Sequence, residues 1–63
     1  MGSSFYRYRV NAGHRDGDVV KATNIKAFSA IDQAENRFVD MQRRYAYVEL
    51  IDIETGSVLR ATK

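Results

Sequence analysis

Residues 29–44 carry a helical pattern, and this one segment limits the folds open to the chain. Ile31, Ala34, Phe38 and Met41 recur at spacings of three, four and three residues, which places them on one face of an α-helix. Most positions between them are polar or charged. An apolar helix face must be buried against another element, and the rest of the chain offers only strand-like segments. The pattern therefore predicts one helix packed on a sheet.

The ends of this helix are predicted from its capping residues. Ser29 can accept a backbone N–H at the N-cap, and Asp32 stands three residues later as an acidic capping-box partner. Arg43 and Arg44 close the segment, where the helix dipole favours positive charge. We therefore expect the helix to run from Ser29 to Arg44.

Residues 5–11 alternate between two sets of side chains, which predicts a half-buried strand. Arg7 and Arg9 form one set, and we expect them to face away from the helix. The other set is apolar or aromatic and is expected to join the core: Tyr6, Tyr8 and Val10.

Residues 12–18 are turn-like because Gly13 and Gly17 bracket a polar stretch, and they predict a hairpin loop longer than two residues. Residues 19–25 predict a second strand with broken alternation. One alternative is that Val20 and Ala22 face the core. The other is that the core-facing residues are Val19, Thr23 and Ile25. A bulge in this strand would let both sets contribute to the core.

Residues 45–62 predict a β-hairpin with a four-residue loop, Ile53 to Gly56. We expect the register that matches apolar with apolar side chains and opposite charges with each other. Its cross-strand pairs are Leu50 with Leu59, Glu49 with Arg60, and Ile51 with Val58. The rejected register, slipped by one residue, pairs Leu50 with Arg60 and sets Glu49 beside Ala61.

This register sorts the hairpin into two faces. The purely apolar face is expected to receive the helix: Ala46, Val48, Leu50, Leu59 and Ala61. The opposite face is mixed: Tyr45, Tyr47, Glu49, Ile51, Val58 and Arg60. The fold class predicted is α+β, a small ββαββ arrangement with an antiparallel sheet of three to four strands. We expect residues 5–63 to form a single domain and residues 1–4 to be disordered.

Composition excludes several kinds of chemistry. The chain has 63 residues and a net charge of +2. It has no cysteine, so disulfides and thiolate metal sites are excluded. His14 is expected to be a solvated loop residue, because no nucleophile accompanies it at a recognisable spacing. Asp16 and Asp18 do not begin a calcium loop, since the position that would need a terminal glutamate is Ala27. We predict no enzyme, cofactor or metal.

Hydropathy and length bear on location and partners. No apolar run reaches membrane-spanning length and no signal-peptide core is seen at the N-terminus, so we expect a cytoplasmic protein without membrane contact. A chain this short buries a small core and is expected to be only marginally stable alone. We therefore predict that the chain gains additional stability by self-association.

The sheet face away from the helix is the predicted functional surface. Its candidate residues are Arg7, Arg9, Tyr47, Glu49, Ile51, Val58 and Arg60. Tyr and Arg are enriched in protein interfaces, so the leading hypothesis is a homo-oligomer or protein-binding module joined through this face or an edge strand. The alternative is weak binding of single-stranded nucleic acid, with phosphates held by basic side chains beside Tyr47. Those side chains are Arg7, Arg9, Lys21 and Arg60.

Overall fold

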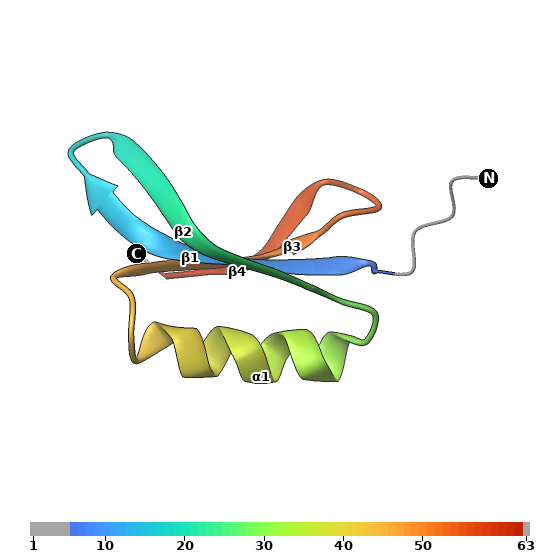
Figure 1. Ribbon diagram of the computed structural model, residues 1–63. Helices are drawn as coiled ribbons and strands as arrows, with labels where there is room; N and C mark the ends of the chain where they lie inside the picture. The colour runs from blue at the N-terminus through green and yellow to red at the C-terminus, as the bar shows by residue number, and fades with distance from the viewer. Residues whose placement is uncertain (1–5, 63) are drawn as a thin grey trace.

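One helix lies across one side of a four-stranded antiparallel sheet in the computed structural model, which describes residues 6–62 (Figure 1). This confirms the ββαββ order and the α+β class. The expectation for residues 1–4 lies outside the described range. Within that range no helix is long and apolar enough to cross a membrane. The elements are β1 (Tyr8–Asp16), β2 (Val19–Phe28), α1 (Ile31–Gln42), β3 (Tyr47–Asp52) and β4 (Ser57–Ala61).

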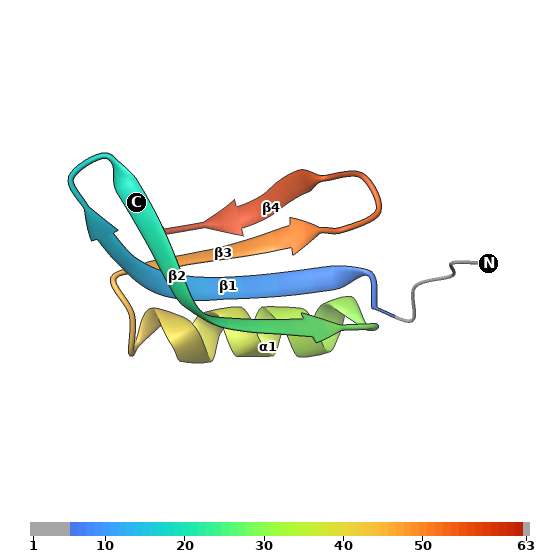
Figure 2. The ribbon, with the colours of Figure 1, turned by 45° about the horizontal axis from the view of Figure 1, so that its top comes forward.

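The sheet has the strand order β2-β1-β3-β4, so β1 and β3 are central and β2 and β4 form the edges (Figure 2). The chain leaves the sheet at the end of β2, runs through α1, and returns as β3 on the far side of β1. Because of this crossover, the helix packs mainly over the central strands. The opposite side of the sheet has no helix over it in the described part of the chain (Figure 1).

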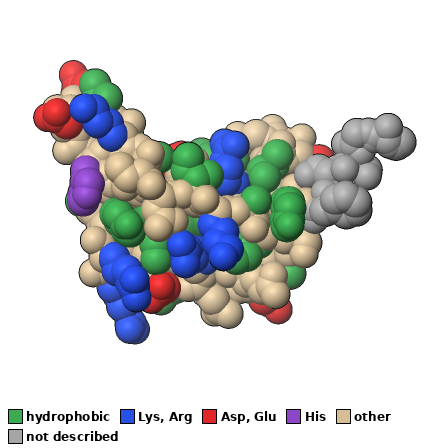
Figure 3. All heavy atoms as spheres, in the orientation of Figure 1, with side chains coloured by type: hydrophobic (Ala, Val, Ile, Leu, Met, Phe, Trp, Pro, Cys, Tyr) green, Lys and Arg blue, Asp and Glu red, His purple; other side chains and the backbone are tan. Residues whose placement is uncertain are grey.

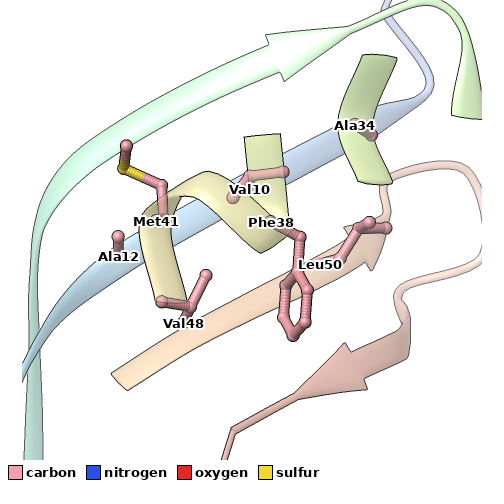
Figure 4. Close-up of a cluster of buried hydrophobic side chains, with 7 residues drawn as sticks. All are labelled: Val10, Ala12, Ala34, Phe38, Met41, Val48 and Leu50. Carbon is pink, nitrogen blue, oxygen red and sulfur yellow. The ribbon is translucent and has the colours of Figure 1, made fainter. Parts of the chain in front are cut away.

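The core fills the space between α1 and the two central strands, and its side chains converge there (Figure 4). The helix contributes the face predicted from its spacing, with Ile31 partly buried at its start. Tyr8, Phe28 and Tyr45 pack around the edge. Tyr6 precedes β1 and is exposed, so its predicted place in the core is wrong. The fully buried set is Val10, Ala12, Ala34, Phe38, Met41, Val48 and Leu50.

The helix begins later than its sequence predicts. Ala30 is the N-cap, with extended backbone angles of φ −112° and ψ 139°, and no side chain hydrogen-bonds the first turn. The predicted Ser29 cap is therefore wrong. Phe28 still belongs to β2, opposite Tyr8, and packs on the core, which holds the chain extended up to the helix start. At the other end Arg43 is the C-cap, close to the predicted limit.

The β1–β2 hairpin is longer and tighter than predicted. Residues 12–16 continue β1, and only Gly17 and Asp18 form the turn. Gly17 has a φ of 65°, a conformation that favours glycine and that suits the first central position of a two-residue type II′ turn. The prediction of a longer loop is wrong because the Gly-Asp pair itself closes the hairpin.

A bulge in β2 confirms the irregularity expected there. Ala12 pairs with Asn24, but Gly13 pairs with Ala22, so Thr23 is the extra residue. A Cβ atom on Gly13 would overlap the carbonyl oxygen of Lys21, so the close approach of the strands requires glycine. The side chains of β2 from Val19 to Thr23 are nevertheless exposed, and so is Ile25. The expectation that they face the core is therefore wrong.

Of the three predicted β3–β4 pairs, one is present and two are wrong. Ile51 pairs with Val58 across the predicted loop from residue 53 to residue 56. A second bulge makes Leu59 the extra residue, so the remaining pairs are Leu50 with Arg60 and Glu49 with Ala61.

Thr62 explains this shift. Its backbone N–H donates to the Val48 carbonyl oxygen at 2.9 Å, and its Oγ1 accepts from the Val48 N–H at 2.9 Å. These bonds fix the end of β4 in the slipped register.

The shift changes the predicted faces of β4: Leu59 is 47% exposed at the bulge, and Ala61 is exposed opposite Glu49 instead of facing the helix. Two residues before β3 were also assigned to the wrong face, since Ala46 is exposed and Tyr45 packs on the core.

Candidate interface on the outer sheet face

We call the side of the sheet opposite α1 the outer face. Val10 and Ala12 are buried beneath the helix, so Arg9 and Asn11, which alternate with them, point to the outer face. The same alternation along β3 places Tyr47, Glu49 and Ile51 there, between the buried Val48 and Leu50. Four of the predicted site residues therefore share one face: Arg9, Tyr47, Glu49 and Ile51.

Apolar side chains continue this face onto both edge strands. Ile25 on β2 lies opposite Asn11, and Val58 on β4 lies opposite Ile51. Ile25 is 61% exposed and Val58 is 55% exposed. The outer face thus carries a band of exposed or half-buried apolar side chains on β2, β3 and β4, and β1 contributes the polar side chains of Arg9 and Asn11 between them.

The sheet bends around this band. Both hairpins turn away from α1 at their ends, so the outer face lies between two raised ends (Figure 1). Seen from the side, the end of the β1–β2 hairpin projects from the body of the molecule, and hydrophobic and basic side chains are interspersed around β2 and α1 (Figure 3). The surface is shaped by the β2 bulge, since bulges bend a strand and increase its twist.

A polar network lies at the centre of the outer face. The Tyr47 hydroxyl donates to Oε1 of Glu49 at 2.6 Å, and the Asn11 amide Nδ2 donates to Oε2 of Glu49 at 3.0 Å. The guanidinium of Arg15 lies over the Tyr47 ring, with its carbon atom 5.7 Å from the ring centroid. The Glu49 carboxylate is therefore held in one position by donors from two strands.

Burial and charge tune this network. The pKa of Tyr47 is raised, first by its hydrogen bond to Glu49, then by burial and by the negative charge of Glu49, while Arg15 opposes the shift. The hydroxyl therefore stays protonated and keeps donating well above neutral pH. Asn11 is only 7% exposed, and its Oδ1 atom has no hydrogen-bond partner within residues 6–62.

Arg7 does not belong to this face, contrary to the sequence prediction. Its guanidinium donates to Oδ2 of Asp52 at 3.3 Å and lies 3.7 Å from Glu54 Oε1. Asp52 is 7% exposed on the helix side of β3, so it needs a partner. Arg7 has a long side chain next to the start of β1 and meets that need. Its role is therefore structural.

Arg60 is also misplaced by the sequence prediction. The bulge at Leu59 sets Arg60 opposite Leu50, on the helix side, where its Nε atom lies 3.3 Å from Oε2 of Glu35. Lys21 lies beyond the other bulge, opposite His14. Of the four bases proposed to hold phosphates, only Arg9 is on the outer face. Val58 is placed there as predicted.

The Arg60–Glu35 pair spans an open groove of about 300 Å³ between α1 and β4. The groove exists because the crossover leaves β4 uncovered on the helix side. Its lining has no hydroxyl, thiol or imidazole group: Glu35, Asn36, Phe38, Val39, Gln42 and Arg60. It therefore offers an ion pair and apolar edges, but no nucleophile.

His14 and the carboxylates do not assemble into a metal site. His14 lies in β1 rather than in a loop, is exposed, and contacts the Tyr45 ring with the centroids 5.7 Å apart. Within residues 6–62, no cluster of three or more His, Asp or Glu side chains is arranged to hold a metal ion.

Sequence reasoning missed Asn11, Arg15 and Ile25 as members of the outer face. Asn11 is the last residue of the predicted strand and continues the alternation of Arg7 and Arg9, so that alternation already places it on this face. Arg15 lies beyond residue 11, where the sequence predicted a loop instead of a continued strand. Ile25 was considered for the core because nothing in the sequence shows that β2 is an edge strand.

Comparison with known proteins gives no matching family model, no matching curated protein and no matching solved structure.

Proposed function

We propose that this chain is a non-enzymatic binding and assembly module that associates with a second copy of itself through the outer face of its sheet. The observation that carries the proposal is the exposed apolar band on the side of the sheet that α1 does not cover. Ile25 and Val58 are both more than half exposed; Val58 lies beside the half-buried Ile51, and Ile25 lies across β1 from β3. Exposed patches of this kind mark contact surfaces in small proteins.

The charge pattern supports a second copy as the partner. The outer face carries Arg9 and Arg15 together with Glu49, so it presents both signs of charge. A two-fold interface brings the same patch together from both subunits, and a patch with both signs can complement itself. An Arg- and Tyr-containing surface with an apolar band also has the composition of an interface core.

Single-stranded nucleic acid is the alternative, and the geometry supports it less. A phosphate-binding face needs several unpaired bases. Arg7 and Arg60 are paired with carboxylates away from this face, and Lys21 lies on the other side of the bulged hairpin end. Near the centre, Glu49 would repel a phosphate.

Light scattering coupled to size-exclusion chromatography tests the proposal. We expect the mass to rise with concentration from 7.2 kDa towards twice that value. Val58→Lys should abolish the rise because it places a charge in the apolar band. Val39→Lys is the matched control, since Val39 has a similar exposure of 52% but lies on α1.

Circular dichroism and thermal unfolding check that both variants remain folded. A wild-type mass that stays at one chain up to high micromolar concentration would contradict the proposal. So would a loss of association in Val39→Lys but not in Val58→Lys.

A further inference from the structure

We infer that the two copies are held in register by a reciprocal ion pair, in which Arg9 of each copy binds Glu49 of the other. This inference rests on the proposed self-association and adds the site that determines its geometry. Arg9 and Glu49 are both on the outer face, and neither takes part in an ion pair within residues 6–62.

The Glu49 carboxylate is positioned to bind a cation. Asn11 and Tyr47 each donate one hydrogen bond, to different carboxylate oxygens, and fix the carboxylate in place. Each oxygen has a second lone pair, so the group keeps acceptor capacity. No guanidinium or ammonium group forms an ion pair with this carboxylate within residues 6–62. The geometry is that of an acceptor site without its cation.

The neighbouring Asn11 amide is the second, independent observation. Its Nδ2 is committed to Glu49, so rotating the amide to exchange its ends would set oxygen against a carboxylate. Its Oδ1 is therefore an acceptor, and it is buried without a partner in the described residues. Buried acceptors are nearly always satisfied, and this atom is shielded within a single copy, so an outside donor reaches it only when side chains of the outer face move. Glu49 and Asn11 together call for a group with several donors.

A guanidinium fits this demand better than an ammonium. It presents five N–H donors in a planar fork that matches a carboxylate and has donors left for an adjacent oxygen. The Arg9 side chain is exposed and has no hydrogen bond, ion pair or ring contact within residues 6–62. The outer face therefore carries both halves of the pair, the anion site and an uncommitted guanidinium.

The positions of the two residues suit a two-fold axis. Arg9 lies opposite Ile51 on β3, and Glu49 is two residues further along that strand, so they are diagonal neighbours. Diagonal neighbours on a sheet are roughly 7–8 Å apart at their Cα atoms. A two-fold axis that passes between two neighbouring residues sets each one over the other in the facing copy. The ion pair then forms twice, near the centre of the outer face.

Charge exchange between two variants tests the inference. Arg9→Glu alone should weaken self-association about tenfold or more, because two opposite-charge contacts become like-charge contacts. Glu49→Arg should weaken it similarly. An equal mixture of the two variants should associate, since each contact between them again joins an acid and a base. Sedimentation velocity measures all three samples.

Controls separate folding from association. The Arg9 side chain makes no hydrogen bond, ion pair or ring contact within residues 6–62, so Arg9→Glu should change the unfolding midpoint little. If Glu49→Arg fails to fold, Glu49→Gln replaces it, and this variant should weaken association without repulsion. Arg15→Glu is the matched charge reversal nearer the hairpin end, and it should weaken association less.

The outcomes distinguish the two proposals. If the wild type associates and Arg9→Glu associates equally well, the reciprocal pair is wrong while the assembly proposal stands. The same holds if the mixed variants associate no better than either one alone. A monomeric wild type overturns both.

Discussion

Asp52 connects the start of β1 with the end of β3 and the loop that follows it. Its carboxylate is nearly buried, accepts from Arg7 at 3.3 Å, and accepts from the Glu54 backbone N–H at 3.0 Å within the β3–β4 loop. Burial on its own raises the pKa of Asp52. The hydrogen bond and positive charge of Arg7, together with the hydrogen bonds from the backbone N–H groups of the loop, lower it by more, so the net pKa lies below the ordinary 3.8. Asp52 is therefore charged in the folded protein.

This shift predicts how stability depends on pH. A carboxyl group with a lowered pKa in the folded state stabilises the fold above its unfolded pKa of about 3.8, and this contribution is lost as the pH falls through the lower folded pKa. We expect Asp52→Asn to be less stable than the wild type at neutral pH, with the difference shrinking below pH 3.8. Urea unfolding at a series of pH values measures it. Asp18→Asn, in the hairpin turn, is the control for removing a carboxylate.

A difference between wild type and Asp52→Asn that persists unchanged well below pH 3 would show that the Asp52 charge is not the stabilising feature.

Gly13 is the second residue with a demanding role. Its neighbour across the bulge is the Lys21 carbonyl oxygen, which occupies the place of a Cβ atom. We expect Gly13→Ala to cost roughly 1–3 kcal/mol in the free energy of unfolding, because the strands must separate to admit the methyl group. Thermal or urea unfolding measures the loss.

Gly56→Ala is the comparison for Gly13→Ala. Gly56 has open space around it but a φ of 78°, so the substitution should cost about 1 kcal/mol through backbone strain alone. Equal stability of Gly13→Ala and wild type would mean that the bulge does not need this close approach.

At the scale of the element, the helix was predicted well in its face and poorly in its start. Its apolar spacing fixes which side is buried whatever the exact ends, and all the predicted positions pack on the core. The start depends on where β2 ends, and that is decided by Phe28 packing and pairing with Tyr8. The capping residues in the sequence do not show where β2 ends, so they could not predict the helix start.

The absence of a side-chain N-cap on α1 leads to a prediction about stability. Ala30 has N-cap backbone angles but no side chain that can accept a hydrogen bond. We expect Ala30→Ser to stabilise the protein by about 1 kcal/mol, a rise of roughly 4–8 °C in the unfolding midpoint. Ser29→Ala should change little, because Ser29 does not cap the helix. A larger loss in Ser29→Ala than gain in Ala30→Ser would reverse this assignment.

The hairpin register shows the limit of pairwise reasoning along the sequence. Matching Leu50 with Leu59 and Glu49 with Arg60 gains only about 0.2–1 kcal/mol per pair. The structure instead joins Glu49 to β1 and Arg60 to α1, both partners from other elements. Long-range partners of this kind follow from the tertiary arrangement. The mixed, partly apolar character of the outer face was nevertheless predictable, because Tyr47, Glu49, Ile51 and Val58 are on it both in the predicted pairing and in the observed, bulged pairing.

At the scale of the whole molecule, the described part of the chain is thin. Its principal extents are 39, 22 and 17 Å, which reflects one helix layer on one sheet layer. The outer face of the sheet carries an apolar band and is not covered by the helix. Another sheet could pack on this face, since sheets pack face to face at a separation of about 10 Å. Two copies joined through their outer faces would form four layers: helix, sheet, sheet and helix.

Intermolecular contacts measured by isotope-filtered NMR, on a mixture of labelled and unlabelled copies, test this account most directly. We expect contacts between copies at the methyl groups of Ile25, Ile51 and Val58, and none at Val39 on the opposite side. Contacts confined to Val39 and Leu59, or to the backbone edges of β2 or β4, would contradict an interface on the outer face. Absence of any intermolecular contact at millimolar concentration would contradict it as well.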